Sequence, residues 1–306
     1  MPPQIITSPQ YTLASDANAF VSGKFYASAM RLVEDGTVLP EDIIAPPFPS
    51  KEDLLLVHSP EWVEKAWNAS LTEEDEVFAQ LKGTKELCYA HILACGGTML
   101  ACEMAVKCGL GLHAGGGGHH ALHDRGCGFC LVNDPAVGAA HAIARLGVKR
   151  VLIVDLDAHQ GNGTAAIFAG RDDVFTLSLH NRAIFPETKA VSSLDVELEP
   201  GCNGAQYMHA LAGGLNKALA AFKPQLALYV AGADPYEGDM LGGLALTKED
   251  LAVRDGFVFS TLLRLGIAVA SVVAGGYARQ RDDLVDIHAQ TLREGVKAWR
   301  AVKSGQ

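Results

Sequence analysis

The feature of the sequence that most constrains its fold is an alternation that begins at about residue 109. Short apolar segments, such as VLIV (151–154) and LALYV (226–230), alternate with longer segments whose apolar residues recur at helical spacing. Strands that alternate with helices predict a parallel sheet covered on both faces. Continuous apolar runs are typical of strands buried on both faces. We therefore predict an α/β fold with a central, mainly parallel sheet flanked by helices.

The alternation predicts individual elements. Proline at the start of segment 135–146 indicates a helix capped by Asp134, and Thr247 with Asp250 three residues later resembles a capping box. The breaker-rich APPFPS segment (45–50) is predicted to be a loop within the domain. The predicted strands are 109–113, 150–157, 174–180, 226–232 and 267–274, and the predicted helices are 135–146, 205–221, 248–265 and 282–302.

Composition narrows the classes of function. The formal net charge is −10 and the lysines and arginines form no runs, so the basic surface of a nucleic-acid-binding protein is missing. A negative surface favours cationic partners such as lysine-rich peptides or polyamines, although ordinary solubility is the better explanation of this charge. The seven scattered cysteines suit free thiols in a reducing compartment, and we expect a cytoplasmic protein.

The sequence shows no targeting or membrane segment. Apolar runs are about eight residues long, whereas a membrane span needs ~20. The N-terminus, MPPQIITSPQYT, has neither a basic start nor an apolar core, so we expect no signal peptide. No internal repeat or low-complexity linker divides the chain, and we predict a single domain over 1–306.

Polar residues lie directly after each predicted strand, at the point where the strand ends. The sequences there are GGGGHHA (115–121), DLDAHQGN (155–162), SLHN (178–181), AGADPYEGD (231–239) and AGGY (274–277). In open α/β sheets, ligands bind beyond the carboxyl ends of the strands. The sequence therefore predicts a site at this edge of the sheet.

A metal ion is the best explanation for one group of these residues. Asp155, Asp157 and His159 share parity, so an extended strand would point them the same way. Buried carboxylates repel one another unless a cation compensates their charge. Carboxylate and imidazole groups bind zinc, and Asp234 supplies a third ligand, which leaves one position open for water. An Asp–His hydrogen bond at a turn is the structural alternative, which the combined motifs disfavour.

Other residues are weaker candidates individually. His119 and His120 come after four glycines, which permit unusual backbone angles, and histidine is the common general acid and base. A metal-binding histidine pair or an exposed loop is an alternative interpretation. The Tyr277 hydroxyl could donate to an oxyanion or pack at a turn. Cys127 and Cys130 form a C-x-x-C pair without a second pair, which favours free thiols over zinc or redox chemistry. Asn162, Asp239 and Asp283 alone would be interpreted as cap or turn residues.

Taken together, the motifs resemble those of the histone deacetylase family of the arginase/deacetylase superfamily. The similarity extends from residue 50 to about residue 290 and is closest to the class IV branch and to bacterial single-domain members. DLDAHQGNG, NRAIFP and EGDMLGGLALT carry the class IV likeness. The matching motifs are AGGGGHHA (114–121), DRGCGFCLVND (124–134), VDLDAHQGNGT (154–164), AGADPYEGDMLGG (231–243) and GGY (275–277).

The resemblance implies an arginase-like, three-layer fold with a sheet of about eight strands. It also implies an amidohydrolase that removes acyl groups from ε-acyl-lysine by means of metal-activated water. Asp157, His159 and Asp234 would bind the metal, as the spacing also predicts. Zinc is the expected ion, and ferrous iron is compatible with a carboxylate-rich site.

The resemblance further implies roles for residues around the metal. His120, paired with Asn162, would take a proton from the water and return it to the leaving amine. Tyr277 would donate to the tetrahedral oxyanion, and His119, held by Asp155, would stabilise charge. The tunnel for the acyl-lysine stem would be lined by Gly128, Phe129 and Phe185. A structural potassium ion would be bound by the side chains of Asp155 and Ser178 and by the backbone carbonyls of Asp157, His159 and Leu179.

The sequence departs from the family pattern at three places. Asn162 stands where class I members have aspartate, so it should raise the pKa of His120 less than a carboxylate would. The glycine run before His119 replaces a proline-containing sequence. Cys127 stands where many members have glycine, and its pairing with Cys130 is open.

Three functions are consistent with these residues. The first is a lysine deacylase acting on acetyl or longer fatty acyl groups of a peptide or protein. The second is a hydrolase of a small acylated amine such as an acetylpolyamine, although no insertion suits the dimer loop that closes such sites. The third, disfavoured by the complete set of ligands, is a catalytically silent acyl-lysine-binding module. The acyl length, the substrate and the oligomeric state are not predicted.

Overall fold

The computed structural model describes residues 3–13 and 22–305, and its framework is one eight-stranded sheet with the strand order β2-β1-β3-β8-β7-β4-β5-β6. Every neighbouring pair in this sheet is parallel, which confirms the predicted central sheet. The strands are β1 (Ile5–Ile6), β2 (Ile43–Ile44), β3 (Leu110–His113), β4 (Val151–Asp155), β5 (Val174–Asn181), β6 (Leu194–Leu198), β7 (Leu226–Ala231) and β8 (Ala268–Val273).

The five predicted strands correspond to β3, β4, β5, β7 and β8, and their ends differ from the prediction by at most two residues. The largest difference concerns β4, which ends at Asp155 and not at Asp157. The edge strands β2 and β6 and the strand next to the edge, β1, are not predicted. Two of them are two residues long, and β6 (LDVEL) alternates apolar with acidic residues, so none has the continuous apolar run of a central strand.

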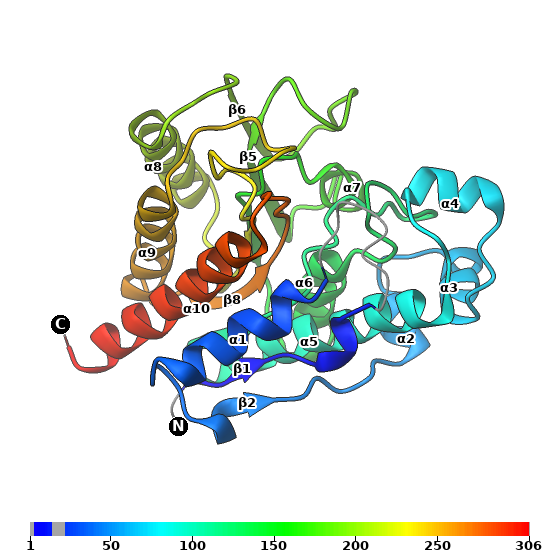
Figure 1. The fold of residues 1–306 in the computed structure, drawn as a ribbon, viewed down its shortest axis with the longest axis horizontal. Helices are drawn as coiled ribbons and strands as arrows, with labels where there is room; N and C mark the ends of the chain where they lie inside the picture. Colours follow the sequence, from blue (N-terminus) through cyan, green and yellow to red (C-terminus); the bar gives the residue numbers. More distant parts are fainter. Residues whose placement is uncertain (1–2, 14–21, 306) are drawn as a thin grey trace.

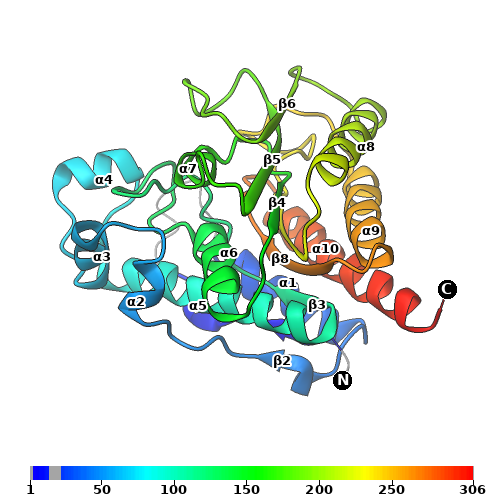
Figure 2. The ribbon, with the colours of Figure 1, turned by 180° about the vertical axis from the view of Figure 1, so that it is seen from behind.

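Helices cover both faces of the sheet, as Figures 1 and 2 show from opposite sides. Helices α1, α9 and α10 lie together on one face and α5 and α6 on the other. Each face has its own hydrophobic core. The helices are α1 (Lys24–Glu34), α2 (Lys51–Leu54), α3 (Pro60–Trp67), α4 (Glu73–Ala79), α5 (Lys85–Cys108), α6 (Asp134–Arg145), α7 (Asn162–Ile167), α8 (Gly204–Ala221), α9 (Lys248–Arg264) and α10 (Arg281–Lys303), with 3-10 turns at Pro9–Tyr11 and Pro40–Asp42.

The predicted helix caps were partly right. Thr247 and Asp250 form the expected capping box at the start of α9. The prediction that Asp134 caps α6 is wrong by one residue, because the side chain of Asn133 accepts the N–H of Ala136. Asp134 instead accepts hydrogen bonds from a glycine loop near the functional edge of the sheet. The Asp134 carboxylate therefore stabilises the glycine loop and does not cap the helix.

Helix α5 is a core element that the sequence pattern does not predict. Its length and composition alone would allow it to cross a membrane, but 67% of its most apolar window is buried inside the protein. It packs against α6, β3 and β8. A helix that is apolar on all sides is expected in such a buried position. The expectation that apolar segments are only about eight residues long is therefore wrong for this segment.

Candidate active site

Three buried side chains beyond the strand ends form a compact group that we call the Asp–His–Asp group. Asp157, His159 and Asp234 each offer a ligand atom, and these atoms all lie within 4.8 Å of one another. The Nδ1 atom of His159 lies 2.9 Å from Oδ2 of Asp234 and 3.1 Å from Oδ1 of Asp157. The structure therefore brings together the three residues that the spacing predicted as metal ligands.

The backbone fixes the two carboxylates of this group. The N–H of Gly275 donates to Oδ2 of Asp157 at 3.0 Å, and the N–H of Ala158 donates to Oδ1 of Asp234 at 2.8 Å. A Cβ atom on Gly275 would lie 2.4 Å from Asp157 Oδ2 and 2.6 Å from Asp234 Oδ2. Only glycine allows the backbone to come this close to the carboxylates.

The reason for this convergence differs from the predicted one. Because β4 ends at Asp155, Asp157 and His159 lie on the loop after the strand and do not share a face of an extended strand. The N–H of His159 donates to Oδ1 of Asp157 at 2.9 Å, so the loop turns back on itself. This turn and the parallel neighbour β7, which carries the loop with Asp234, bring the three side chains together.

The donor set fits a divalent cation. In the metal-free protein, burial disfavours a charged imidazole, but hydrogen bonds from His159 to Asp157 and Asp234 raise the pKa of His159 to about 10. Burial and the Asp157 carboxylate raise the pKa of Asp234. Both shifts favour protonation, so in the metal-free protein protons offset the negative charge that a bound cation would otherwise balance. Two carboxylates and one imidazole are also a donor set that zinc and iron accept.

His119 and His120 face this group from a glycine loop. Gly116 and Gly117 have φ values of +80° and +84°, as the glycine run predicted. The Asp134 carboxylate accepts the N–H groups of Gly117 (3.1 Å) and Gly118 (2.7 Å), which fixes the loop directly before the two histidines. The buried Asp134 therefore supplies rigidity that the glycines lack.

The two histidines have different partners. His119 Nδ1 lies 2.7 Å from Oδ2 of Asp155, and His120 Nδ1 lies 2.7 Å from Oδ1 of Asn162. Burial opposes protonation of both rings. For His119, Asp155 and Asp157 outweigh burial and raise the pKa to about 9. For His120, burial and the neighbouring His119 and His159 hold the pKa well below its ordinary value.

Tyr277 lies beside His159 of the Asp–His–Asp group. Its ring centroid lies 6.2 Å from that of His159 and 6.0 Å from that of Phe129. Its backbone N–H donates to the carboxylate of Asp239, which the sequence reading treated as a cap or turn residue. Burial and the nearby Asp157 and Asp234 raise the pKa of the Tyr277 hydroxyl well above its ordinary value, so it stays protonated.

A pocket borders these residues where the resemblance implies a tunnel, and we call this pocket the tunnel. Gly128, Phe129 and Phe185, the predicted lining, all border it together with His120, His159 and Tyr277. Gln80, Ile184 and Leu241 also line it and were not predicted. Gly128 and Phe129 have φ values of +51° and +63°, and they lie in a turn closed by two backbone hydrogen bonds of 2.9 Å between Cys127 and Cys130.

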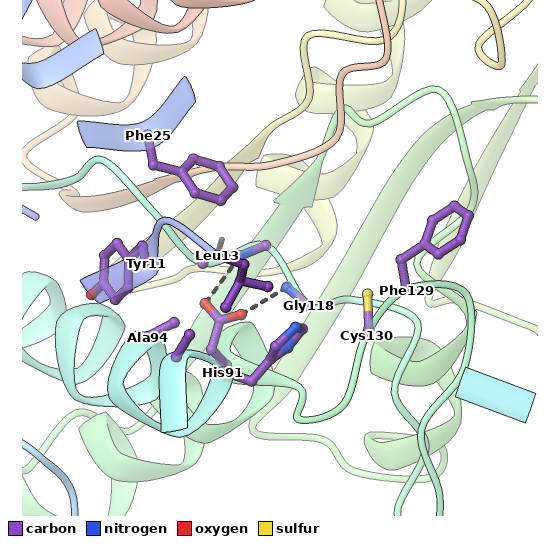
Figure 3. Close-up of a pocket in the computed structure, with 12 residues that line it drawn as sticks. Tyr11, Leu13, Phe25, His91, Ala94, Gly118, Phe129 and Cys130 are labelled. Atoms are coloured by element: carbon purple, nitrogen blue, oxygen red, sulfur yellow. Dashed lines mark hydrogen bonds between the residues drawn. The ribbon is translucent and has the colours of Figure 1, made fainter. Parts of the chain in front are cut away.

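A second cavity, mostly apolar, shares Phe129 with the tunnel. Figure 3 shows Tyr11, Phe25 and Ala94 around it, with Cys130 and Gly118 at the side that faces the histidine loop. The dashed lines in Figure 3 are the hydrogen bonds that fix the glycine loop to Asp134. The cavity therefore adjoins the loop that carries the two histidines.

The residues predicted to bind potassium are also close together. Asp155 and Ser178 are register partners on the neighbouring strands β4 and β5. The Ser178 hydroxyl lies 2.9 Å from Nδ1 of His180, and Asp155 binds His119. Both side chains thus already have protein partners.

A buried arginine that the sequence does not predict, Arg254, binds the backbone of the loops that carry the Asp–His–Asp group. Arg254 donates to the carbonyls of Gly232 (2.8 Å) and Leu156 (3.4 Å), which lie in the loops that carry Asp234 and Asp157. Its charge is compensated by Asp255 at 2.8 Å. Because arginine is mostly exposed in folded proteins, the sequence alone predicts a surface position for Arg254.

Comparison with known proteins agrees with this architecture. A histone deacetylase domain matches residues 20–292. An uncharacterized protein of Picosynechococcus sp. is 39% identical over 287 residues, which are 93% of this chain and 95% of the relative. Histone deacetylase 2 of Arabidopsis thaliana is 33% identical over 306 residues, and the match covers 95% of this chain and 79% of the relative.

Solved structures agree on the fold. The crystal structure of an HDAC homologue complexed with SAHA has a TM-score of 0.80 at 22% identity and covers 96% of this chain and 84% of its own. The HDA15 HD domain has a TM-score of 0.78 at 23% identity and covers 100% of this chain and 90% of its own. The predicted arginase-like fold is confirmed. Because the family domain accounts for residues 20–292 and the relatives match along most of their length, the chain belongs to the histone deacetylase family.

Proposed function

We propose that the protein is a zinc-dependent hydrolase that removes acyl groups from the ε-amine of acyl-lysine in a peptide or protein. The observation that carries the proposal is that His120, Tyr277 and His159 of the Asp–His–Asp group all line one cavity. Relatives that are named histone deacetylase or probable deacetylase support the reaction class.

Asp157, His159 and Asp234 would hold the metal. A divalent cation bound there polarises a carbonyl group and lowers the pKa of water. Ferrous iron is compatible with the same ligands. We also keep the proposal that Asp155, Ser178 and the carbonyls of Asp157, His159 and Leu179 bind potassium, supported by the pairing of Asp155 with Ser178.

His120 is suited to be the general base. Its Nδ1–H donates to the amide oxygen of Asn162, so the neutral ring presents Nε2 as a proton acceptor. Its low pKa keeps it neutral before the reaction. After Nε2 has taken a proton from the attacking water, the charged ring returns this proton to the nitrogen of the leaving lysine.

His119 and Tyr277 stabilise charge in this scheme. His119, charged because of Asp155 and Asp157, does not compete as a base but offsets negative charge beside the reacting carbonyl. The protonated hydroxyl of Tyr277 donates a hydrogen bond to the oxygen that becomes negative in the transition state. Phe129 and Phe185 suit the aliphatic stem of an acyl-lysine.

The test is turnover on a panel of peptides that carry acyl-lysines from acetyl to myristoyl, with acetylpolyamines alongside. We expect activity on acyl-lysine peptides that is lost on chelation and restored by Zn²⁺ or Fe²⁺. Tyr277→Phe is the control for the site, and we expect it to retain the metal while turnover falls by about 10²–10³-fold. Turnover confined to acetylpolyamines, or full turnover after complete chelation, would contradict the proposal.

A further inference from the structure

A lysine lies fully buried behind the catalytic tyrosine. Lys24 is the first residue of α1 and its side chain is completely enclosed. Its Nζ atom donates to the carbonyl of Ala274 at 3.1 Å and to the carbonyl of Gly276 at 3.1 Å. These two carbonyls flank Gly275 and directly precede Tyr277. A buried ammonium group therefore binds the turn 274–277, which we call the tyrosine turn.

The tyrosine turn is held between opposite charges. Its carbonyls face the ammonium group of Lys24, whereas its N–H groups face carboxylates. The N–H of Gly275 donates to Asp157 and the N–H of Tyr277 donates to Asp239. Charge-assisted hydrogen bonds are roughly twice as strong as neutral ones. These four bonds are shared by two peptide groups, 274–275 and 276–277, and fix the orientation of both.

Glycine lets the backbone adopt this orientation but does not enforce it. Gly276 has a φ of +146°, which L side chains rarely adopt. A Cβ atom there would lie 2.9 Å from a methyl group of Leu284 and 3.0 Å from Cβ of Ala233. Because glycine is otherwise the most permissive residue, an external contact has to select one conformation. Lys24 supplies a contact on the carbonyl side.

Lys24 also touches the tyrosine itself. Its Nζ lies 5.7 Å from the centroid of the Tyr277 ring, within the range of a cation–π contact. The nearby carboxylates of Asp234, Asp239 and Asp157 favour the ammonium form. In the metal-free protein, burial lowers the pKa of Lys24 to about 8 in spite of them.

We propose that Lys24 is a positioning residue, whose ammonium group holds the tyrosine turn so that Tyr277 stays beside the Asp–His–Asp group. The inference rests on the proposed function, because it assumes that the Tyr277 hydroxyl donates to the oxyanion. Lys24 itself touches no reacting atom. It acts through the carbonyls of Ala274 and Gly276, and its removal lowers the rate of the metal-loaded enzyme.

The experiment is a double-mutant cycle on the metal-loaded enzyme. We expect Lys24→Met, saturated with metal, to lower kcat by about 10²-fold, as displacement of a catalytic group by ~1 Å does, with KM unchanged. Lys24→Arg, which also donates to two carbonyls, restores most of the rate. In a Tyr277→Phe background, Lys24→Met causes no further loss, because the two residues act through one hydroxyl.

Amide hydrogen exchange of the metal-free protein gives a readout that needs no substrate. We expect Lys24→Met to accelerate exchange in a peptide that covers the tyrosine turn. Ser28→Ala is the matched control, since Ser28 is buried one turn further along α1 and donates to the carbonyl of Phe25. It should leave this exchange unchanged. If Lys24→Met does not fold, Lys24→Gln takes its place with the same expectations.

The outcomes separate the two hypotheses. Losses that multiply in the double variant, or unchanged exchange at the tyrosine turn, would overturn the role of Lys24. A wild-type protein that turns over no acyl-lysine peptide would contradict the proposed function and the catalytic part of this inference. In that case, accelerated exchange in Lys24→Met would still show that Lys24 stabilises the tyrosine turn.

Discussion

His119 and His120 are neighbours in the sequence, with ring centroids 4.0 Å apart, and yet their pKa values shift in opposite directions. Burial penalises the charge on both rings, but Asp155 compensates this penalty for His119 and the amide of Asn162 does not do so for His120. One environment keeps a ring charged and the other keeps a ring neutral. A neutral base beside a fixed positive charge is the pairing that the proposed hydrolysis requires.

Asn162→Asp is therefore expected to move the pH dependence of catalysis. A carboxylate beside Nδ1 would stabilise the charged form of His120 and raise its pKa. The base must be neutral before the reaction, so activity of the variant should be lost at a higher pH than in the wild type. The acidic limb of kcat/KM against pH measures this change.

Asn162→Ala is the matched control for that profile. It removes the same hydrogen bond without adding charge, so its kcat/KM should fall while the acidic limb does not move to higher pH. If the aspartate and alanine variants shift the limb alike, His120 is not the group that the profile reports.

Metal binding is expected to release protons. In the metal-free protein the pKa of His159 is raised to about 10, whereas a metal ligand must be neutral. Metal and proton compete below this pKa, so the affinity for Zn²⁺ should rise by about tenfold per pH unit between the pKa of Asp234, raised to about 7, and that of His159. Calorimetric titration in buffers of different ionisation enthalpy counts the protons released, and an affinity that is independent of pH would refute the competition.

His159→Asn provides the comparison for this titration. The variant keeps both carboxylates but lacks the titrating ring, so it should bind Zn²⁺ much more weakly and with less proton release. Equal proton release by the variant and the wild type would place the titrating group elsewhere.

The sequence predicted most of the site because parallel strands bring their carboxyl ends to one edge. Asp157, His159 and Asp234 could be assigned from the polar residues that come after each strand, even though the assumed end of β4 was two residues too late. The tunnel residues Gly128, Phe129 and Phe185 came from family motifs and do line one cavity. Strands of two residues such as β1 carry too few residues for any periodicity.

The supporting residues could not be predicted in this way. Lys24 and Arg254 are among the largest fully buried side chains of the described protein, whereas lysine and arginine are almost always exposed. Their role depends on backbone carbonyls, which carry no sequence signal. Asp134 was assigned to the nearest helix because local spacing suggests a cap, but its carboxylate binds the glycine loop instead.

Arg254→Met is expected to destabilise the protein strongly. The variant leaves Asp255 buried without its cation and leaves the carbonyls of Gly232 and Leu156 without that donor. Breaking a buried ion pair typically costs about 3–5 kcal/mol. Urea unfolding measures the loss. Arg264→Met, at the exposed end of the same helix, should cost less than about 0.5 kcal/mol, and equal costs would contradict the supporting role of Arg254.

Mild acid is expected to destabilise the protein through buried neutral histidines, and His58 is the clearest case. Burial lowers the pKa of His58 to about 4 in spite of its hydrogen bonds. Its Nε2 accepts the N–H of Asn133 at 3.0 Å. The unfolded chain binds a proton near the ordinary value of 6.5, so stability is complete above that pH and falls as the pH decreases towards 4. The slope from this residue is about 1.4 kcal/mol per pH unit.

His58→Gln tests this dependence, because the glutamine oxygen can accept the same N–H without titrating. The free energy of unfolding of the variant should fall less steeply than that of the wild type as the pH decreases from 6.5 towards 5, above the range in which most carboxylates titrate. His209→Gln removes an exposed histidine and should leave the slope unchanged. If His58→Gln and the wild type lose stability in parallel over this interval, His58 does not enter the folded protein as a neutral ring, and the acid sensitivity has another source.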